Sequence, residues 1–330
     1  MVSQQHSKPG SRTSTPMSPA RFPLAVRRRN PRFFVFFLVT PPAFLAFVFF
    51  PAPLFRPAHA ADLFGNLTQR LLQDGFSRDH VSAIFSPEPE PAYERVVLSL
   101  RTRESRLNYE QFLKPDAVEQ AERFLREHRH LFKEVEERYG VDPYVVAGIL
   151  LVETRCGEVT GRTPVLETFV TFALMEDPVH RNHVWERLPA SDRRRLGRTA
   201  FEEKLKNRSR WAYGELYALL QWTQGEPDRT RGLRGSFMGA IGWPQFLPSS
   251  ILHYGVDGDG DGRINLFEPA DTLHSVGNYL KSFGWNRAQT RDDRTRVLLH
   301  YNRSRPYAAT ILDVADLLRK RTDLASASRP

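Results

Sequence analysis

Cysteine is almost absent from this sequence: Cys156 stands alone among 330 residues. A single thiol cannot form a disulfide within the chain, so packing alone must hold the fold together. A chain of this length can bury enough apolar surface to do so. The region before residue 61 contains no cysteine either, which argues against a lipid-anchored lipoprotein.

Acidic side chains are absent from the first 60 residues, which contain eight lysines and arginines. The net charge of +9 comes almost entirely from this segment, because the rest of the chain has 39 basic and 38 acidic residues. A nearly neutral body gives no electrostatic case for binding nucleic acid.

The first 60 residues have the pattern of an export signal. A basic cluster at 27–32 precedes the apolar run FFVFFLVTPPAFLAFVFF (33–50), and Ala58 and Ala60 form a small-x-small cleavage signature. We expect a secretion signal over 1–60, cleaved after Ala60, that delivers the body to the periplasm. The alternative is an uncleaved segment that anchors the protein in the inner membrane and is its only membrane contact.

Strand-like alternation and Gly-rich hairpins are missing from residues 61–330, where helical periodicity dominates. The pattern predicts an extended crossing over 86–96, short helices and loops over 235–250, and helices over 63–75, 76–85, 115–140, 141–155, 211–224, 271–285 and 306–322. The charge-dense segment 177–210 is expected to form an exposed helical insertion. The predicted fold class is all-α, with one domain over 61–330.

The strongest local motif is DGDGDGRINLFE (257–268), which matches the calcium-loop template of EF-hands at every constrained position. Asp257, Asp259 and Asp261 stand at positions 1, 3 and 5. The Arg263 carbonyl stands at position 7 and Glu268 at position 12. The alternative is an acidic glycine turn that binds nothing. A single loop after a short helical segment predicts one structural Ca²⁺ site rather than a sensor pair.

Glu153 interrupts the apolar character of the helix predicted over 141–155. It stands three residues after Leu150 and continues the stripe formed by Val146 and Leu150, in the last turn, where the helix dipole is negative. Burial and the dipole both raise the pKa of a carboxyl group there, as a general acid requires. The alternative is a glutamate at the core edge that pairs with Arg155 or Arg162.

Two further groups of residues allow either a binding or a packing interpretation. The segment 235–250 mixes glycines with aromatic residues and suits a sugar groove whose stacking faces are Phe237, Trp243 and Phe246. Close helix packing through the glycines is the alternative. Near the C-terminus, Tyr301, Asn302 and Tyr307 by themselves favour only core tyrosines and a capping asparagine.

The chain resembles the membrane-bound lytic murein transglycosylase B family, glycoside hydrolase family 103. The resemblance spans about residues 105–315 and rests on VETRCG (152–157), GSFMGAIGWPQFLPSS (235–250), DGDGDGRINLFEPAD (257–271) and YNRSRPYA (301–308). It implies a lysozyme-like helical catalytic domain with an embedded EF-hand-like calcium loop and a groove for peptidoglycan glycan strands. The implied activity cleaves the β-1,4 bond between N-acetylmuramic acid and N-acetylglucosamine without water and leaves a 1,6-anhydro-muramoyl end.

The resemblance assigns the chemistry to one carboxylate, Glu153. It would protonate the leaving glycosidic oxygen, the substrate's N-acetyl oxygen would assist at the anomeric carbon, and Glu153 would then deprotonate the C6 hydroxyl that closes on C1. Ser236 is expected to orient Glu153 or the N-acetyl group, and Gln245 to bind the adjacent sugar. The other groove residues that the resemblance implies are Tyr301, Asn302, Tyr307 and Arg208.

Two positions depart from the family pattern. Cys156 stands where relatives often carry an aromatic residue, and we expect it to fill space behind the acid. The family's late acidic calcium ligand corresponds to Asp271, whereas template position 12 is Glu268, so either can be the bidentate ligand.

Two other functions remain open at this level: a muramidase that hydrolyses the same bond, and a non-catalytic peptidoglycan-binding protein. Proteins of cell-wall synthesis or division are further partners that this interpretation allows.

Overall fold

The computed structural model describes residues 64–101, 108–223 and 226–327, all within the compact unit Pro57–Pro330. The predicted export segment over 1–60 lies outside the described residues. None of the helices in the described ranges is both long enough and apolar enough to span a membrane.

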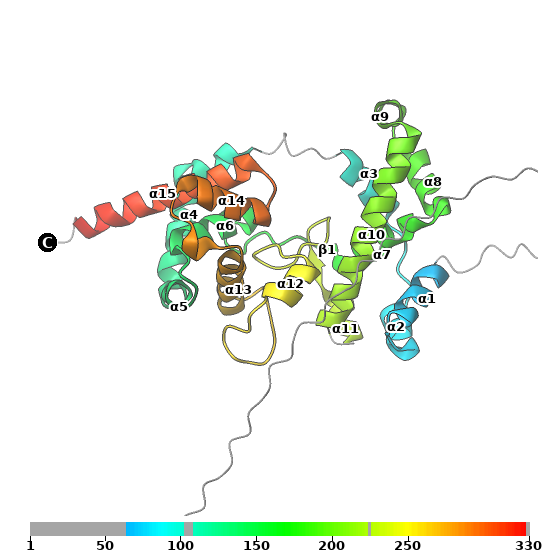
Figure 1. Cartoon of the computed structure of the whole chain (residues 1–330), viewed down its shortest axis with the longest axis horizontal. Helices are drawn as coiled ribbons and strands as arrows, with labels where there is room; N and C mark the ends of the chain where they lie inside the picture. Colours follow the sequence, from blue (N-terminus) through cyan, green and yellow to red (C-terminus); the bar gives the residue numbers. More distant parts are fainter. Residues whose placement is uncertain (1–63, 102–107, 224–225, 328–330) are drawn as a thin grey trace, which may run out of the picture. The chain divides into compact units, whose positions relative to one another are not determined.

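Helices make up nearly all of the regular structure in the described ranges, which confirms the predicted all-α class (Figure 1). The only strands there are β1 (Thr163–Pro164) and β2 (Arg234–Gly235), which pair antiparallel with Thr163 opposite Gly235. The helices are α1 (Gly65–Gln73), α2 (Arg78–Ile84), α3 (Tyr93–Arg101), η2 (Tyr109–Leu113), α4 (Pro115–Glu127), α5 (Arg129–Tyr139), α6 (Pro143–Thr154), α7 (Val165–Ala173), η3 (Leu174–Glu176), α8 (Pro178–Arg187), α9 (Ala190–Leu196), α10 (Arg198–Trp222), α11 (Pro227–Gly232), α12 (Pro248–Tyr254), α13 (Pro269–Ser282), η4 (Trp285–Arg287), α14 (Arg291–Tyr301) and α15 (Arg305–Ala327).

Helix α6, which carries Glu153, lies at the centre of a group of helices formed by α4, α5, α13 and α15. Its start follows the sequence closely: the Asp142 carboxylate accepts the Tyr144 N–H at 2.9 Å, and Pro143 occupies the first turn. The helix is apolar on almost every side, so it packs against α4, α5, α13 and α15 at once. This burial fixes the position of the last turn, where Glu153 lies.

The predicted helix over 115–140 is two helices, because the backbone breaks at His128 (φ −110°, ψ 26°). The His128 ring packs edge-on against Phe124 at 4.6 Å between centroids. The break allows α4 to pack mainly on α6 while α5 packs mainly on α13. Gly140 ends α5 in the left-handed conformation (φ 65°), as the sequence predicts.

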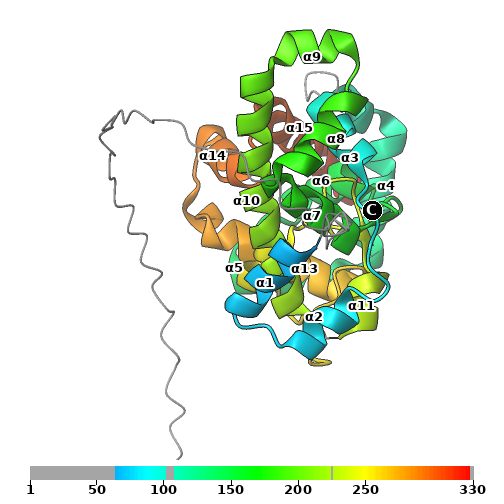
Figure 2. The same cartoon turned by 90° about the vertical axis from the view of Figure 1, so that its right-hand side faces the viewer.

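The charged segment 177–210 is helical, but the expectation of a purely exposed insertion is wrong. It forms α8, α9 and the first half of α10. Helix α10 then continues without a break to Trp222, over most of the helix predicted at 211–224, and packs along α7 (Figure 2). Phe201 and Leu205 on α10 are fully buried, and the buried Arg181 donates to the carbonyl oxygens of Met175 and Glu176. The apolar stripe at i, i+4 joins this segment to the core despite its charge.

Two other helices differ from the sequence expectation. The segment 86–96 is not extended throughout, because α3 begins at Tyr93. Helix α14 is absent from the predicted helices because it buries only Val297 and Leu298, too little for a clear periodicity. The local signal that marks its start is a capping box between Thr290 and Asp293.

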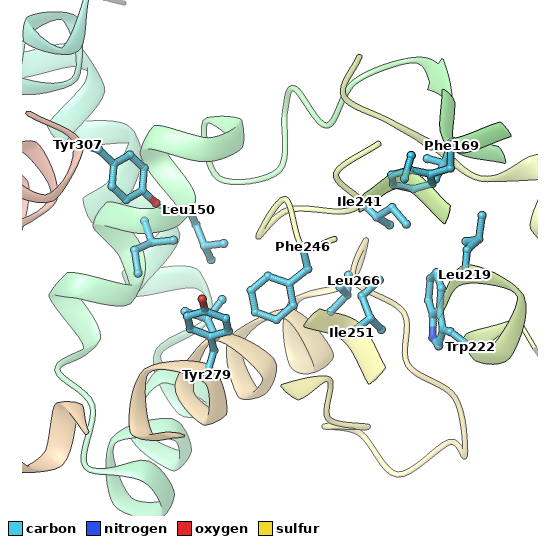
Figure 3. Close-up of a cluster of buried hydrophobic side chains, with 14 of the residues drawn as sticks. Leu150, Phe169, Leu219, Trp222, Ile241, Phe246, Ile251, Leu266, Tyr279 and Tyr307 are labelled. Atoms are coloured by element: carbon cyan, nitrogen blue, oxygen red, sulfur yellow. The ribbon is translucent and has the colours of Figure 1, made fainter. Parts of the chain in front are cut away.

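The segment 235–247 folds into a tight loop inside the core. Bridges pair Gly235 with Ile241 and Ile241 with Phe246, which turns the chain back on itself. Figure 3 shows Ile241, Phe246 and Leu266 between the helices, with Leu150 of α6 nearby. The core therefore places this loop against the end of α6.

Candidate active site

Glu153 lies in the last turn of α6 and is held by Tyr307 of α15. The Tyr307 hydroxyl donates to Oε1 of Glu153 at 2.6 Å, and Figure 3 shows this hydroxyl pointing toward the helix that carries Leu150. Glu153 retains some exposed surface, yet protein atoms surround its carboxyl group. Burial raises the pKa of Glu153 to about 7, although the hydrogen bond from Tyr307 lowers it in part. Both protonation states are therefore populated near neutral pH.

Tyr301 and Tyr307 lie beside the acid, and Tyr109 packs against Tyr307. The rings of Tyr301 and Tyr307 are nearly parallel at 6.3 Å between centroids, and Tyr109 meets Tyr307 edge-on at 6.4 Å. Tyr301 donates its hydroxyl to the Pro244 carbonyl at 2.6 Å. Burial and the neighbouring Glu153 charge raise the pKa of Tyr301 and Tyr307 well above the usual value. Both remain neutral hydrogen-bond donors.

The backbone after Glu153 turns sharply. Arg155, Cys156 and Gly157 have φ values of 51°, 57° and 94°, all in the left-handed region. A Cβ on Gly157 would lie 2.5 Å from the Trp243 ring, so only glycine fits there. The Arg155 guanidinium donates to the Gln111 side chain at 3.2 Å, so this arginine is engaged away from the acid.

Cys156 has the surroundings of a packing residue. Its side chain is partly buried and lies against the hydrophobic core. Burial, with the nearby Glu158 charge adding to it, raises the pKa of the thiol to about 12. A neutral, shielded thiol fits the expectation that Cys156 fills space behind the acid.

Ser236 and Gln245 lie on the loop 235–247 but use their side chains locally. The Ser236 hydroxyl oxygen accepts the N–H groups of Met238 (3.3 Å) and Ala240 (3.1 Å). The Gln245 amide donates to the carbonyls of Gly242 (2.8 Å) and Thr160 (3.2 Å). Among the hydrogen bonds of the described residues, none joins Ser236 to Glu153.

The remaining predicted groove residues differ in their surroundings. Asn302 follows α14 and is partly exposed. Arg208 donates to the carbonyl and hydroxyl oxygens of Ser99 and lies beside Lys204 and Trp211 in a surface pocket of about 410 Å³.

The three predicted stacking aromatics also differ. Phe246 is 3% exposed, so it is a core residue, and the prediction of a stacking face there is wrong. Trp243 is partly buried and packs edge-on against Phe124. Phe237 is partly exposed.

The predicted calcium loop brings three carboxylates together. Oxygens of Asp257, Asp259 and Asp271 lie within 4.8 Å of one another. Asp257 accepts the N–H groups of Gly260 and Gly262 at 2.7 and 2.8 Å, which curls the loop around its carboxylate. This all-oxygen donor set on a tightly curled loop fits a hard cation such as Ca²⁺.

Asp271 and Glu268 were alternatives for the last ligand, and only Asp271 lies in this group. The buried Asp271 carboxylate accepts the N–H groups of Gly258 (2.7 Å) and Asn265 (2.6 Å). Glu268 instead stands at the N-cap position of α13, without a side-chain capping hydrogen bond, and accepts the Asn265 side-chain amide at 2.6 Å. Asp261 also lies outside the group, with its carboxylate accepting the Arg263 N–H.

The described residues form a helical, lysozyme-like fold in which the Glu153 carboxyl group is enclosed at the end of a core helix. The chain belongs to the family described as Transglycosylase SLT domain, whose model matches residues 60–292. It is 33% identical to the membrane-bound lytic murein transglycosylase B of Escherichia coli over 174 residues, which cover 53% of this chain. The match spans only 40% of that relative's length.

Solved structures support the same fold. The E. coli lytic transglycosylase Slt35 in complex with calcium is 22% identical with a TM-score of 0.62, covering 78% of this chain and 93% of that one. SltB1 from Pseudomonas aeruginosa is 20% identical with a TM-score of 0.62, covering 78% and 98% of the two chains. SltB3 from the same organism, in complex with NAG-anhNAM-pentapeptide, is 23% identical with a TM-score of 0.60, covering 77% and 78%.

Proposed function

We propose that this protein is a lytic transglycosylase that cleaves the β-1,4 bond between N-acetylmuramic acid and N-acetylglucosamine of peptidoglycan and forms 1,6-anhydro-muramoyl ends. The observation that carries the proposal is the Tyr307–Glu153 pair, which holds one carboxylic acid with a pKa near neutrality. The family and the names of its relatives support the same substrate class.

The reaction uses Glu153 twice. Glu153 in its protonated form gives its proton to the glycosidic oxygen as the bond to C1 breaks, and the N-acetyl oxygen of the muramic acid stabilises C1 from the opposite side. The Glu153 carboxylate then takes the proton of the C6 hydroxyl, whose oxygen bonds to C1. Acid and base roles need both protonation states, which a pKa of about 7 supplies.

Substrate assistance explains why one carboxylate suffices. A retaining glycosidase with two carboxylates needs a second one about 5–5.5 Å from the first. Burial and Tyr307 account for the pKa of Glu153, with no contribution from another carboxylate of the described residues. The N-acetyl oxygen of the substrate takes the place of that second group.

The residues around Glu153 would hold the glycan strand. Gln245, Tyr301 and Asn302 are proposed to bind the sugars next to the acid, with Phe237 as a stacking face. The Ser236 hydroxyl accepts two backbone N–H groups and so fixes the shape of the loop 235–247. Ser236 would therefore orient the N-acetyl group indirectly, by holding this loop in place. Arg208 and its pocket would meet the lactyl or peptide groups that the muramic acid carries.

We propose one Ca²⁺ ion in the loop 257–271, bound by Asp257, Asp259 and Asp271. The Arg263 carbonyl, together with Asp261 after a side-chain rotation, would complete its coordination. Bound to the folded chain, the ion would stabilise the loop against unfolding. A related structure in complex with calcium supports this assignment.

The proposed substrate lies outside the inner membrane, so the protein is proposed to act in the periplasm. Residues 1–60 would serve as its export signal or, uncleaved, as a membrane anchor, and 61–330 as its catalytic domain. The proposed partners are glycan strands of the wall, with synthesis or division proteins as further ones.

Product analysis tests the proposal. Purified sacculi are digested with the wild type and with Glu153→Gln, and the released fragments are weighed by mass spectrometry. The proposal requires anhydro ends from the wild type and a loss of at least about 1,000-fold in rate for the variant. Reducing ends would identify a muramidase instead. Binding of sacculi without turnover by the wild type would identify a non-catalytic binding protein.

A further inference from the structure

Thr154 directly follows the acid and ends α6, with its side chain 1% exposed. A threonine hydroxyl within a helix commonly bonds back to the carbonyl four residues earlier. Here that contact, to Leu150, is 3.4 Å long, whereas the contact to the Trp243 carbonyl is 2.9 Å. The hydroxyl oxygen also accepts the Gly157 N–H at 3.1 Å. Thr154 therefore ties the turn after Glu153 to the loop 235–247.

Trp243 continues this connection to the loop that holds the acidic cluster. Its backbone N–H donates to the Leu266 carbonyl at 2.8 Å, and the same carbonyl accepts the Thr272 hydroxyl at 3.0 Å. Leu266 follows Asn265, whose N–H binds the Asp271 carboxylate at 2.6 Å. A chain of hydrogen bonds and peptide units thus runs from Asp271 to the end of α6.

Close packing leaves this connection little freedom to relax. Gly242, next to Trp243, has φ 73°, and a Cβ there would lie 2.4 Å from the Leu266 carbonyl oxygen. The Trp243 ring is pressed between Gly157 and Phe124, whose ring centroid is 5.8 Å away. A displacement of Leu266 must therefore move Trp243, because a close-packed interior transmits strain.

We propose that Thr154 is a positioning residue for Glu153 and that, through the Trp243 backbone, it couples the acid to cation binding at Asp257, Asp259 and Asp271. The inference rests on the proposed role of Glu153. It adds that the state of the loop 257–271 changes the placement of the acid as well as the stability of the fold.

The acid can be observed separately from its neighbours. The titratable groups that face Glu153 are Tyr307 of α15 and Tyr301 at the end of α14. Their pKa values lie well above the usual tyrosine value. Among the groups that face Glu153, only Glu153 itself therefore ionises near neutral pH.

Two substitutions of Thr154 isolate its hydroxyl. Thr154→Val removes the hydroxyl and keeps the shape, whereas Thr154→Ser keeps the hydroxyl. The matched control is Thr171→Val on α7: Thr171 is also 1% exposed, donates to the Glu167 carbonyl at 2.6 Å and accepts the Ala92 N–H at 3.0 Å. Thr154→Val should lower kcat about tenfold with KM within about twofold. Thr154→Ser should restore kcat, and Thr171→Val should lower only Tm.

The wild type and Thr154→Val are then each compared with added Ca²⁺ and with a chelator. Both are measured at a temperature where circular dichroism reports every sample folded. In the wild type, chelation should lower kcat about fivefold and move the Glu153 pKa, read from ¹³C-labelled carboxyl groups by NMR. In Thr154→Val, chelation should leave kcat and this pKa unchanged, while it lowers Tm as much as in the wild type.

Equal effects of chelation on kcat and on the Glu153 pKa in both proteins would overturn the inference, as would a wild-type kcat in Thr154→Val. The NMR measurement needs no turnover. A wild type without activity would therefore refute the proposed function, while the calcium dependence of the Glu153 pKa would still decide whether the coupling exists.

Discussion

Tyr307 and Glu153 are 154 residues apart in the sequence and are joined by a hydrogen bond of 2.6 Å. The tyrosine comes from α15 and the acid from the end of α6, two helices that pack against each other. This pairing holds the carboxyl group in one orientation and limits how far burial raises its pKa. The proposed chemistry depends on both effects.

Replacement of Tyr307 by phenylalanine removes the group that lowers the Glu153 pKa. Because the hydrogen bond favours the carboxylate, its loss should move the fall of kcat/KM with pH from about 7 to a higher value. The acid also loses its support, so kcat should fall about 10- to 100-fold. The pH profiles of kcat/KM for the wild type and for Tyr307→Phe check this. A profile that moves to lower pH in the variant would contradict the account.

Glu153 should make the fold less stable as the pH rises. Its pKa is raised from 4.5 to about 7 on folding, so its contribution is fully present below pH 4.5 and is lost as the pH rises through 7. The difference corresponds to about 3 kcal/mol. Glu153→Gln lacks this ionisation, so its free energy of unfolding in urea should exceed that of the wild type by more at pH 8 than at pH 5. An equal difference at both values would refute the assigned shift.

The calcium site should depend on Asp271 more than on Glu268. Only Asp271 lies with Asp257 and Asp259, so Asp271→Asn should weaken Ca²⁺ binding at least about tenfold, and Glu268→Gln much less. Calcium at about 100 times its Kd should stabilise the wild type by about 2.7 kcal/mol. Calorimetric titration and thermal unfolding with and without a chelator measure both quantities. The reverse order of the two variants would show that the loop rearranges around Glu268 when the ion binds.

Gly157→Ala should damage both fold and activity. The new Cβ would lie 2.5 Å from the Trp243 ring at a backbone φ of 94°, so the turn after Glu153 has to move. We expect a loss of about 2–4 kcal/mol in the free energy of unfolding and a lower kcat. Gly214→Ala is the control, because its Cβ meets nothing within 4 Å and alanine favours the helix α10 by about 1 kcal/mol. A Gly157→Ala enzyme as stable and active as the wild type would contradict the described turn.

Local signals made part of this structure predictable. Asp142 and Pro143 start α6, and Gly140 ends the preceding helix, because capping depends on a few adjacent residues. The burial of Glu153 follows from its position on an apolar helix. The curled acidic loop follows from the calcium-loop spacing.

The rest depends on contacts between distant segments. Nothing near Glu153 in the sequence indicates Tyr307 as its partner, and position 12 of the loop template favours Glu268 although the fold places Asp271 beside the other carboxylates. Phe246 has the composition of a sugar-stacking face but is turned into the core by the bridges around Ile241. These outcomes are set by tertiary packing.

The central claim is that Glu153 completes the reaction with the C6 hydroxyl instead of water. Digestion of sacculi in H₂¹⁸O, followed by mass spectrometry of the new muramoyl ends, tests it most directly. The account predicts anhydro ends that contain no ¹⁸O from the wild type and no such ends from Glu153→Gln. Muramoyl ends that carry one ¹⁸O atom each would contradict it, because the bond would then have been cleaved by water.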